Sequence, residues 1–548
     1  MITLNNMISL SEEQKKALRH ILRFLRGSNK LFLLQGNAGS GKSTIITQLL
    51  LDSGFSKKKI ALCATTNKAV SVLEHMFPRT SNTTFMTIHK LLKIKRVIDL
   101  EGKEQFVSQL DLSSNEDWKP NKANKSIHHY DIVVIDECSM INTSLANYII
   151  NLSKGIKGKI IFVGDSLQLP PINENKSKIF SLDIPNYKLI EVMRFKNNIT
   201  LLANDVKTLI ANNSHKLKIK KYLGNGVNLF RSLDKLLESY IVSYKSGENP
   251  IILVYTNKKK DEINTKIRSI LFNTKEDFIV GDLIVFNKYY KHYSSDLSFY
   301  ASQQVVIKSV SSKTIYMNNL NFSDLVNLKY SFKIDKVEDL VPIVHVESIV
   351  CPICYTEEAD FVRETPCHHY FCSGCILLWL EKNKTCPYCR MNIKDNKINI
   401  KNEDELTNKI NILKEKTNNK SYKIKILYTE LDKLEIIHED SLDDYKKDVE
   451  FIRNSLYDIK KSIDKNNLDT FKKTILNRLW EFYYNNYIDR FADISYGYCI
   501  TTHKSQGSTY KNVFVDVQNI VNTNINEHKF NCLYTAITRA SNDLNVYL

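Results

Sequence analysis

One eight-residue motif near the amino terminus restricts the fold of this 548-residue chain more than any other feature. Residues 36–43 read GNAGSGKS and match the P-loop pattern G-x-x-x-x-G-K-[ST]. The motif lies between the apolar run LFLLQ and the helical pattern TIITQLL. In that context the glycines let backbone N–H groups wrap phosphates, and the following helix points its positive dipole end at them. The sequence therefore predicts a nucleotide site at the edge of an α/β sheet.

The residues of this loop receive separate roles. Lys42 is expected to neutralise the β- and γ-phosphates of ATP, and Ser43 is expected to bind Mg²⁺. The remaining residues expected to contact the nucleotide within the loop are Gly36, Asn37, Ala38, Gly39, Ser40, Gly41 and Thr44.

A second motif, VVIDECSM, places two acids at the carboxyl end of a hydrophobic strand. Asp136 is expected to hold Mg²⁺ through water, and Glu137 to orient and deprotonate the attacking water. Taken alone, such a pair is an ordinary polar strand end. Together with the phosphate loop it indicates NTP hydrolysis, because metal, base and phosphate cradle must converge on one edge.

The rest of the chain reads as an α/β protein with a long insertion. Apolar runs followed by helical patterns recur from Leu31 to Phe195, and a second such region begins with PIILVYTN and resumes with ISYGYCITTHKSQGS and KNVFVDV. Within the insertion, Leu406, Ile410 and Leu413 mark a helix, YKIKILYTEL and LEIIHE predict a hairpin, and Ser441 with Asp444 is expected to cap a charged helix. The expected boundaries are 1–195 and 196–277 plus 488–548 for the two α/β domains, 278–347 for a small β-rich unit, 348–393 for the cysteine cluster and 394–487 for the hairpin and helices.

Seven of the eleven cysteines fall in one cluster with the spacing C-x2-C-x12-C-x-H-x2-C-x2-C-x10-C-x2-C. Eight soft ligands make two tetrahedral Zn²⁺ sites. They are Cys351, Cys354, Cys367, His369, Cys372, Cys375, Cys386 and Cys389. His368 adjoins His369, and the spacing alone leaves an exchange between the two conceivable. The other four cysteines, Cys63, Cys138, Cys499 and Cys532, lie in apolar runs and are expected to be small buried side chains in a reducing compartment.

Charge and hydropathy limit the classes of partner that the chain is expected to have. The formal net charge is +17, which favours a polyanion, although a Lys- and Asn-rich coding bias gives the same excess. The amino terminus lacks the features of an export signal and no apolar run reaches the 18 or so residues that span a bilayer. We therefore expect a soluble intracellular protein without a membrane partner.

Further motifs follow in an order that resembles the superfamily 1 helicases, most closely the RecD and Dda branch. GDSLQLPP begins at residue 164, EVMRF contains Arg194, HKSQGST begins at His503 and YTAITRA contains Arg539. The resemblance implies two RecA-like domains with parallel sheets and the nucleotide between them. It also implies that Gln168 senses the γ-phosphate, that Arg194 and Arg539 reach it from across the cleft, and that Gln14 contacts adenine. Either arginine could instead be a structural ion-pair partner.

The same resemblance implies translocation 5′ to 3′ on single-stranded or forked DNA. The residues that it assigns to nucleic acid are Thr66, Asn67, Lys68, Phe85, His89, Thr502, His503 and Lys504. A buried core position is an alternative for Phe85. Residues 93–107 alternate like a hairpin and lie where relatives carry a strand-separating pin, and a surface hairpin without that role is the alternative.

The cysteine cluster resembles a RING finger, in which the first and third ligand pairs share one zinc and the second and fourth share the other. In the RINGs of ubiquitin ligases, positions matching Ile353, Trp379 and Pro387 form the groove for the ubiquitin-conjugating enzyme, and the position of Arg390 bridges to ubiquitin. The resemblance thus implies ubiquitin-ligase activity, with a purely structural or docking module as the alternative.

The leading hypothesis is an ATP-dependent DNA helicase that carries a ubiquitin-ligase module. An RNA helicase and a RING protein with a vestigial motor are the alternatives. A ubiquitin-linked module implies the cytoplasm or nucleus of a eukaryotic cell, and its union with a phage-like helicase in an Asn/Lys-rich chain suggests a large DNA virus and a viral replication site.

Overall fold

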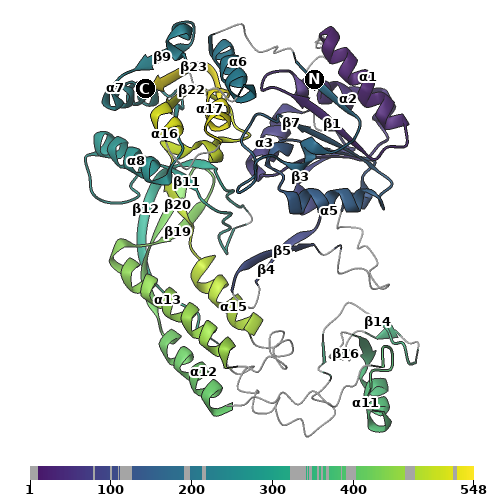
Figure 1. Ribbon diagram of the computed structural model, residues 1–548. Coiled ribbons are helices and arrows are strands. Elements are labelled where there is room, and N and C mark those ends of the chain that lie inside the picture. Colours follow the sequence, from purple (N-terminus) through teal and green to yellow (C-terminus); the bar gives the residue numbers. More distant parts are fainter. Residues whose placement is uncertain are drawn as a thin grey trace.

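Two parallel sheets lie side by side and carry a long insertion (Figure 1). The computed structural model describes residues 10–77, 80–98, 102–108, 110, 126–190, 198–212, 217–295, 297–320, 341, 343–344, 349–354, 357–358, 362–365, 369–383, 385–390, 403–462, 476–522 and 528–548. None of the helices in these ranges has the length and apolar character that crossing a membrane requires.

The first sheet has six strands in the order β3-β2-β6-β7-β1-β8, all parallel. Its strands are β1 (Leu31–Gly36), β2 (Ile60–Ala64), β3 (Thr83–Thr87), β6 (Ile132–Ile135), β7 (Lys159–Gly164) and β8 (Asn186–Leu189). Successive side chains of β1 enter cores on opposite faces, so that Leu34 packs with Ile45 and Leu33 packs with Ile149. The covering helices are α1 (Glu12–Arg26), α2 (Lys42–Leu51), α3 (Asn67–Met76), α4 (Ile88–Leu91) and α5 (Thr143–Ser153).

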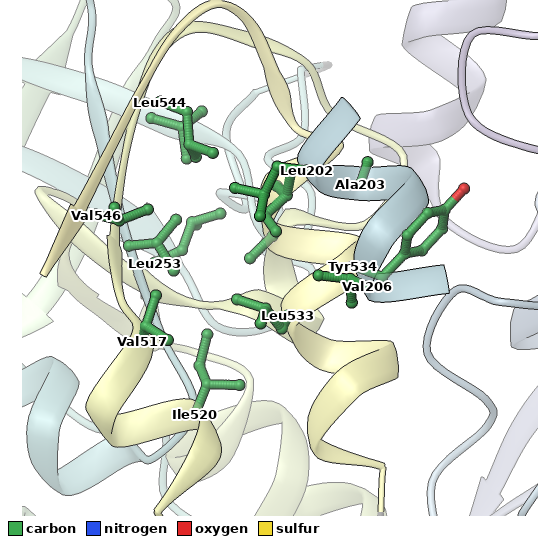
Figure 2. Close-up of a cluster of buried hydrophobic side chains, with 14 of the residues drawn as sticks. Leu202, Ala203, Val206, Leu253, Val517, Ile520, Leu533, Tyr534, Leu544 and Val546 are labelled. Atoms are coloured by element: carbon green, nitrogen blue, oxygen red, sulfur yellow. The ribbon is translucent and has the colours of Figure 1, made fainter. Parts of the chain in front are cut away.

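The second sheet has five parallel strands in the order β21-β10-β22-β23-β9. They are β9 (Val227–Phe230), β10 (Ile251–Val254), β21 (Cys499–Thr501), β22 (Tyr510–Asp516) and β23 (Ala540–Tyr547). Helices α6 (Asn198–Ala211), α7 (Leu233–Lys245), α8 (Asn257–Phe272), α16 (Val517–Val521) and α17 (Lys529–Ile537) pack on it. Figure 2 shows Leu202 of α6, Leu253 of β10 and Leu533 of α17 in one core cluster. The predicted interruption of this sheet is confirmed, because β10 pairs with β21 across the insertion.

The two β-containing parts of the insertion form one antiparallel sheet in the order β19-β18-β12-β11-β20. Its strands are β11 (Leu283–Phe286), β12 (Gln304–Tyr316), β18 (Ser421–Thr429), β19 (Lys433–Ile437) and β20 (Ile494–Tyr496). The predicted hairpin is confirmed as β18–β19. The assignment of residues 494–496 to the second parallel sheet is wrong, because they pair antiparallel with β11 and the chain re-enters that sheet only at Cys499.

Three helices extend from this antiparallel sheet and form an arm with their own core. They are α12 (Glu403–Thr417), α13 (Glu439–Lys461) and α15 (Asn477–Tyr483), the last continued by a π-helical turn over Tyr484–Ile488. The predicted helix marked by Leu406, Ile410 and Leu413 is confirmed. The predicted cap of α13 is wrong, because His438 caps the helix at Asp440 N, whereas the Ser441 hydroxyl accepts a hydrogen bond from Lys423 N at 2.9 Å.

The predicted hairpin after α4 is confirmed as β4 (Ile94–Ile98) paired antiparallel with β5 (Glu104–Ser108). It reaches from the first sheet to α15 of the arm (Figure 1). The Tyr484 hydroxyl donates to Gly102 O at 2.8 Å, and Arg96 forms ion pairs with Glu104 at 3.2 Å and with Asp489. Ile98 packs against the arm core. The hairpin is therefore bound at its tip by a part of the chain almost 400 residues away in sequence.

The cysteine cluster folds as a separate small unit. It contains β13 (Ile343–Val344), β14 (Ile349–Val350), β15 (Glu357–Glu358), β16 (Val362–Glu364), β17 (Tyr370–Cys372) and α11 (Ser373–Lys382). Its apolar core consists of a few side chains, among them Val341, Phe371, Ile376 and Leu380. A core this small needs additional cross-links to be stable, and bound metal would supply them.

Gly102 provides a test of the contact between hairpin and arm. Its φ is +66°, and a Cβ atom there would lie 2.6 Å from Trp480 Cζ2, so Gly102→Ala must push the hairpin away from the tryptophan. Gly247→Ala is the matched control, because Gly247 has φ +80° and a Cβ atom there meets nothing within 4 Å. Both substitutions carry the same left-handed backbone cost of about 1–2 kcal/mol. Only Gly102→Ala should increase quenching of tryptophan fluorescence by acrylamide, and equal quenching in both variants would contradict the contact.

Candidate active site and metal centres

The phosphate loop lies between β1 and α2, as the sequence predicts. Gly39 and Gly41 have φ of +79° and +82°, which side chains other than glycine rarely adopt. Lys42 Nζ donates to Gly36 O at 2.7 Å and to Asn37 O at 3.0 Å. Ala38 N donates to Asp165 Oδ2 at 3.0 Å. A backbone N–H group of the loop thus already donates to a carboxylate, and a phosphate requires donors of the same kind.

The acidic pair follows β6 and faces the same loop. Glu137 N donates to Asp136 Oδ1 at 2.8 Å, and Glu137 itself has a left-handed backbone with φ +52°. Desolvation, together with the neighbouring Glu137 charge, raises the pKa of the Asp136 carboxyl to about 7. A carboxyl in this condition favours a nearby cation, because a cation stabilises the ionised form. This electrostatic environment fits the Mg²⁺ role expected of Asp136.

Arg539 reaches the same cavity from the second sheet. Its side chain is 4% exposed, and its guanidinium donates to Thr535 O at 3.0 Å and to Ser508 O at 3.1 Å. Burial lowers the pKa of Arg539, and the charge of Glu137 opposes that change. A buried guanidinium that is bonded to neutral groups retains its attraction for an anion. The other predicted arginine, Arg194, lies outside the described residues.

Two residues that the sequence did not single out join the sheets beside the loop. The Tyr534 hydroxyl donates to Asp165 Oδ2 at 2.8 Å, and Ala38 N lies 3.3 Å from the same hydroxyl. Figure 2 shows the Tyr534 ring at the border of the core cluster with its hydroxyl directed away from it. A second bond runs from Leu169 N to Thr535 Oγ1 at 3.1 Å. In each bond one residue lies in the motif GDSLQLPP and the other in YTAITRA. The sequence motifs therefore marked both segments but did not show which side chains meet.

A cavity of about 290 Å³ opens between these elements. Its volume suits a small ligand such as a nucleotide. Within the described part of the chain, two buried oxygens of this region, Gln168 Oε1 at the cavity and Ser40 Oγ in the loop, have no hydrogen-bond partner. The predicted residues that line the cavity are Gln14, Ala38, Gly39, Gly41, Lys42, Ser43, Thr44, Asp136, Glu137, Gln168 and Arg539. Gly36, Asn37 and Ser40 belong to the loop but do not line this space.

Two lysines of the nucleic-acid set bridge different parts of the molecule. Lys68, at the start of α3, donates to Ser302 O and to the Tyr510 hydroxyl, each at 3.1 Å. Lys504 donates to Asn287 Oδ1 at 2.5 Å, and burial lowers its pKa. The Thr66 side chain caps α3 by accepting from Ala69 N, and Asn67 is the first residue of that helix.

The other members of the set lie deeper. Phe85 is half-buried and packs against the core of the first sheet, in line with the core alternative. Thr502 is fully buried and its hydroxyl donates to Val254 O at 3.2 Å. His89 lies 5.8 Å from the Phe106 ring of β5 and His503 lies beside Tyr255, and burial lowers the pKa of both imidazoles.

The RING ligands gather in the two predicted groups. The side-chain ligand atoms of Cys351, Cys354, Cys372 and Cys375 lie within 4.8 Å of one another, as do those of His369, Cys386 and Cys389. The predicted sharing of alternate ligand pairs is confirmed for these seven residues, whereas Cys367 and His368 lie outside the described part of the chain. Burial and the neighbouring thiols raise the pKa of Cys372 and Cys375. A bound divalent cation is what would let such crowded thiols ionise together, so the donor set fits zinc.

The residues expected to meet a conjugating enzyme lie in the first and last ligand loops and on α11. Ile353 and Trp379 are half-buried against the RING core, and the Trp379 indole donates to Thr385 O at 2.8 Å. Pro387 is half-buried, and Arg390 is exposed with φ +63°. The structure thus leaves part of each of these side chains accessible.

Comparison with known proteins agrees with both the two-sheet nucleotide site and the zinc-binding unit. Residues 9–227 match the AAA domain family, residues 496–547 the UvrD-like helicase C-terminal domain and residues 349–390 the Ring finger domain. The chain is 28% identical to the uncharacterized protein R530 of Acanthamoeba polyphaga mimivirus over 97% of this chain and 98% of that protein. It is 28% identical to the ATP-dependent DNA helicase Dda of Enterobacteria phage T4 over 52% of this chain and 63% of that helicase. It is 47% identical to the E3 ubiquitin-protein ligase RNF181 of Danio rerio over 9% of this chain and 31% of that ligase.

Removal of the Tyr534 hydroxyl tests the bond between the sheets. Tyr534→Phe leaves Asp165 without one of its donors, which should cost about 1–3 kcal/mol of unfolding free energy. The KM for ATP should rise about fivefold, equivalent to ~1 kcal/mol, because Asp165 also positions Ala38 N. Tyr240→Phe on α7 is the matched control, since that buried hydroxyl has no partner to lose among the described residues. Denaturant unfolding and steady-state ATPase assays measure both effects, and identical behaviour of the two variants would contradict the assigned role.

Proposed function

We propose that this chain, a relative of the superfamily 1 helicases of the Dda type that also carries a RING finger, is an ATP-driven motor on single-stranded DNA. One observation carries the proposal. A single cavity is lined by Lys42 and Glu137 of the first sheet and by Arg539 of the second. When catalytic groups are divided between two bodies, hydrolysis depends on their relative position, and a hydrolysis cycle can therefore move one against the other. By analogy with the Dda branch we propose movement 5′ to 3′.

The proposed chemistry distributes charge around the γ-phosphate. Lys42 exchanges its two loop carbonyls for phosphate oxygens, and Arg539 approaches from the opposite side. Glu137 accepts the proton of the attacking water, and Gln168 orients that water through its Oε1, for which the described residues supply no partner. Ser43 and Asp136 are the residues that would hold Mg²⁺, which neutralises phosphate charge when bound. Arg194 remains a proposed second cation for the same phosphate.

The contacts between the sheets offer a route from the nucleotide to the strand. Asp165 contacts the phosphate loop and Tyr534 together, and Leu169 N bonds to the adjacent Thr535, so we propose that loss of the γ-phosphate alters the contacts of α17. Lys68 and Lys504 lie on opposite sheets and are proposed to hold phosphates of the strand. Thr66, Asn67 and His503, which adjoin those lysines in sequence, stay in the proposed set, as does His89.

The hairpin β4–β5 is proposed to separate strands at a fork. A wedge must resist the force of the duplex, and this hairpin is held at its tip by Trp480 and Tyr484 of the arm. Arg96, in the middle of β4, adds an ion pair with Asp489 of the same part of the chain. These contacts support the proposed role because they hold the hairpin against the arm.

For the RING we propose ubiquitin-protein ligase activity. The RING would hold two zinc ions and present Ile353, Trp379 and Pro387 to a ubiquitin-conjugating enzyme, while Arg390 contacts ubiquitin. Such a module aligns the charged donor and forms no covalent intermediate of its own. The identity to a named E3 ligase over this segment supports the proposal.

Strand-stimulated ATP hydrolysis tests the motor. Wild-type protein should hydrolyse ATP faster with single-stranded DNA than without it. Lys42→Ala should lower kcat at least about 100-fold, because it removes a charge that stabilises the transition state. Glu137→Gln should lower kcat similarly while ATP binding, measured by fluorescence of a labelled nucleotide, persists.

Lys57→Ala is the control for Lys42→Ala, since Lys57 is an exposed lysine of the same domain. Stimulation by RNA alone would assign the motor to RNA. Equal rates with DNA, with RNA and without either would contradict the motor altogether.

Ubiquitin transfer tests the RING. The chain should ubiquitinate itself with an activating enzyme, a conjugating enzyme, ubiquitin and ATP, and Ile353→Ala should abolish this while two zinc ions per chain remain by elemental analysis. Val350→Ala is the control, because it removes an apolar side chain, 62% exposed, just outside the first ligand pair. Loss in both variants, or no transfer with a broad panel of conjugating enzymes, would leave only a structural role for the RING.

A further inference from the structure

The loop between β11 and β12 lies between the two lysines that the sequence assigns to nucleic acid. Residues 287–295 and 297–303 of this loop are described. Asn287 at its start accepts from Lys504 at 2.5 Å, and Ser302 near its end accepts from Lys68 at 3.1 Å. One lysine belongs to the first parallel sheet and the other to the second. The loop is therefore continuous with the proposed strand-binding face on both sides of the cleft.

The first part of this loop alternates between buried and exposed side chains. Residues 288–293 read KYYKHY, and Tyr290 and His292 point into the small sheet, where both are buried. The exposed positions carry two cations, Lys288 and Lys291, and two large rings, Tyr289 and Tyr293. Tyr289 is 57% exposed and Tyr293 is 68% exposed. A folded protein gains nothing from ring surface left in water, so the pattern indicates an external partner.

The buried members of the loop hold the exposed ones in place. The Tyr290 ring stacks with Phe286 and Phe299, and its hydroxyl accepts from Glu435 N at 3.2 Å. His292 Nε2 lies 3.4 Å from Glu435 Oε1. Burial raises the pKa of Tyr290 well above its usual value, so the hydroxyl remains protonated. A backbone fixed in this way presents its outward side chains at a lower entropic cost of binding.

The chemistry of the exposed side chains selects one class of partner. Ring faces accept bases by stacking without regard to sequence, and lysines between them meet phosphates of the same strand. A protein partner would favour an apolar centre with few lysines. Arg490 covers one face of Tyr293 with its guanidinium 4.3 Å from the ring centroid, which adds positive charge beside the ring. Alternating rings and cations therefore fit a single-stranded nucleic acid better than a protein.

We infer that the loop segment Lys288–Tyr293 is a further single-strand contact, in which Tyr289 and Tyr293 stack on bases and Lys288 and Lys291 contact phosphates. This inference rests on the proposed function, because it extends the path of the strand from Lys68 and Lys504 onto the small antiparallel sheet. It also gives that sheet a role in strand binding, through residues that lie outside all of the motifs described above.

Binding of fluorescein-labelled oligothymidylate to the full zinc-loaded chain tests the stacking. The double variant Tyr289→Ala/Tyr293→Ala, which loses two stacked bases, should bind at least about 25-fold more weakly by fluorescence anisotropy, at tenfold per 1.4 kcal/mol. The strand concentration for half-maximal ATPase should rise by the same factor, while kcat at saturating strand stays within about twofold. Tyr289→Phe/Tyr293→Phe should restore affinity. Tyr316→Ala, which removes a ring that is 77% exposed at the far end of β12, should have no effect.

The lysines have their own readout. Lys288→Ala/Lys291→Ala should reduce the slope of log affinity against log salt by about 0.7 per lost phosphate contact, and Lys308→Ala on β12 should leave the slope unchanged. A wild-type chain that binds no strand would overturn this inference together with the proposed motor. A wild-type chain that binds and is stimulated, with tyrosine and lysine variants equal to their controls, would overturn this inference alone and leave the exposed rings to a protein partner.

Discussion

The hydrogen bond between the Tyr534 hydroxyl and Asp165 joins the second sheet to the phosphate loop, and the proposed motor depends on it. Asp165 also accepts from Ala38 N, so one carboxylate is hydrogen-bonded to both the loop and the neighbouring domain. Around it the catalytic groups are divided, with Lys42 and Glu137 on one side of the cavity and Arg539 on the other. Burial makes each of these interactions stronger than it would be in water, and also makes an unpaired partner costly. Under the proposed function, a change in the nucleotide changes the contact between the sheets.

The insertion adds an antiparallel sheet, a helical arm and the RING to the two parallel sheets. Strands from both sides of the RING segment, β12 and β18, pair along most of their length, so the antiparallel sheet closes independently of the metal-binding unit between them. Its helices form the core that contains Trp480 and contacts the tip of the hairpin. The loop before β12 faces the strand path through Asn287 and Ser302. Arm, hairpin and strand path are thus linked through one small sheet.

Local motifs in the sequence predicted most of what holds nucleotide and zinc. The phosphate loop, the acidic pair and the CxxC pairs are contiguous residues whose geometry is set by a strand end, a helix start or a tight turn. Contacts between distant segments could not be predicted in this way. Asp165 and Tyr534 lie 369 positions apart, and only the packing of two sheets brings them together. The pairing of β20 with β11 was missed for the same reason, since an apolar strand fits either sheet until its partner is known.

Two further features show where local chemistry is ambiguous. His438 caps α13, although the sequence offered Ser441 as a better capping residue; the pairing of Lys423 with the Ser441 hydroxyl takes that side chain away. Residues 288–293, KYYKHY, lie within the unit predicted to be β-rich, yet they form a loop whose outward rings and lysines lie beside the proposed strand path. In both cases tertiary contacts decided among local options of similar free energy.

The division of the catalytic site between two sheets is tested most directly by a structure of the full chain with ADP, aluminium fluoride, magnesium and a single-stranded oligonucleotide. The account predicts that the fluoride occupies the cavity with Lys42 and Arg539 on opposite sides, and that Arg539 gives up its bond to Ser508 O to reach it. A nucleotide bound only by residues of the first sheet, with Arg539 still on Ser508 and Thr535, would contradict it.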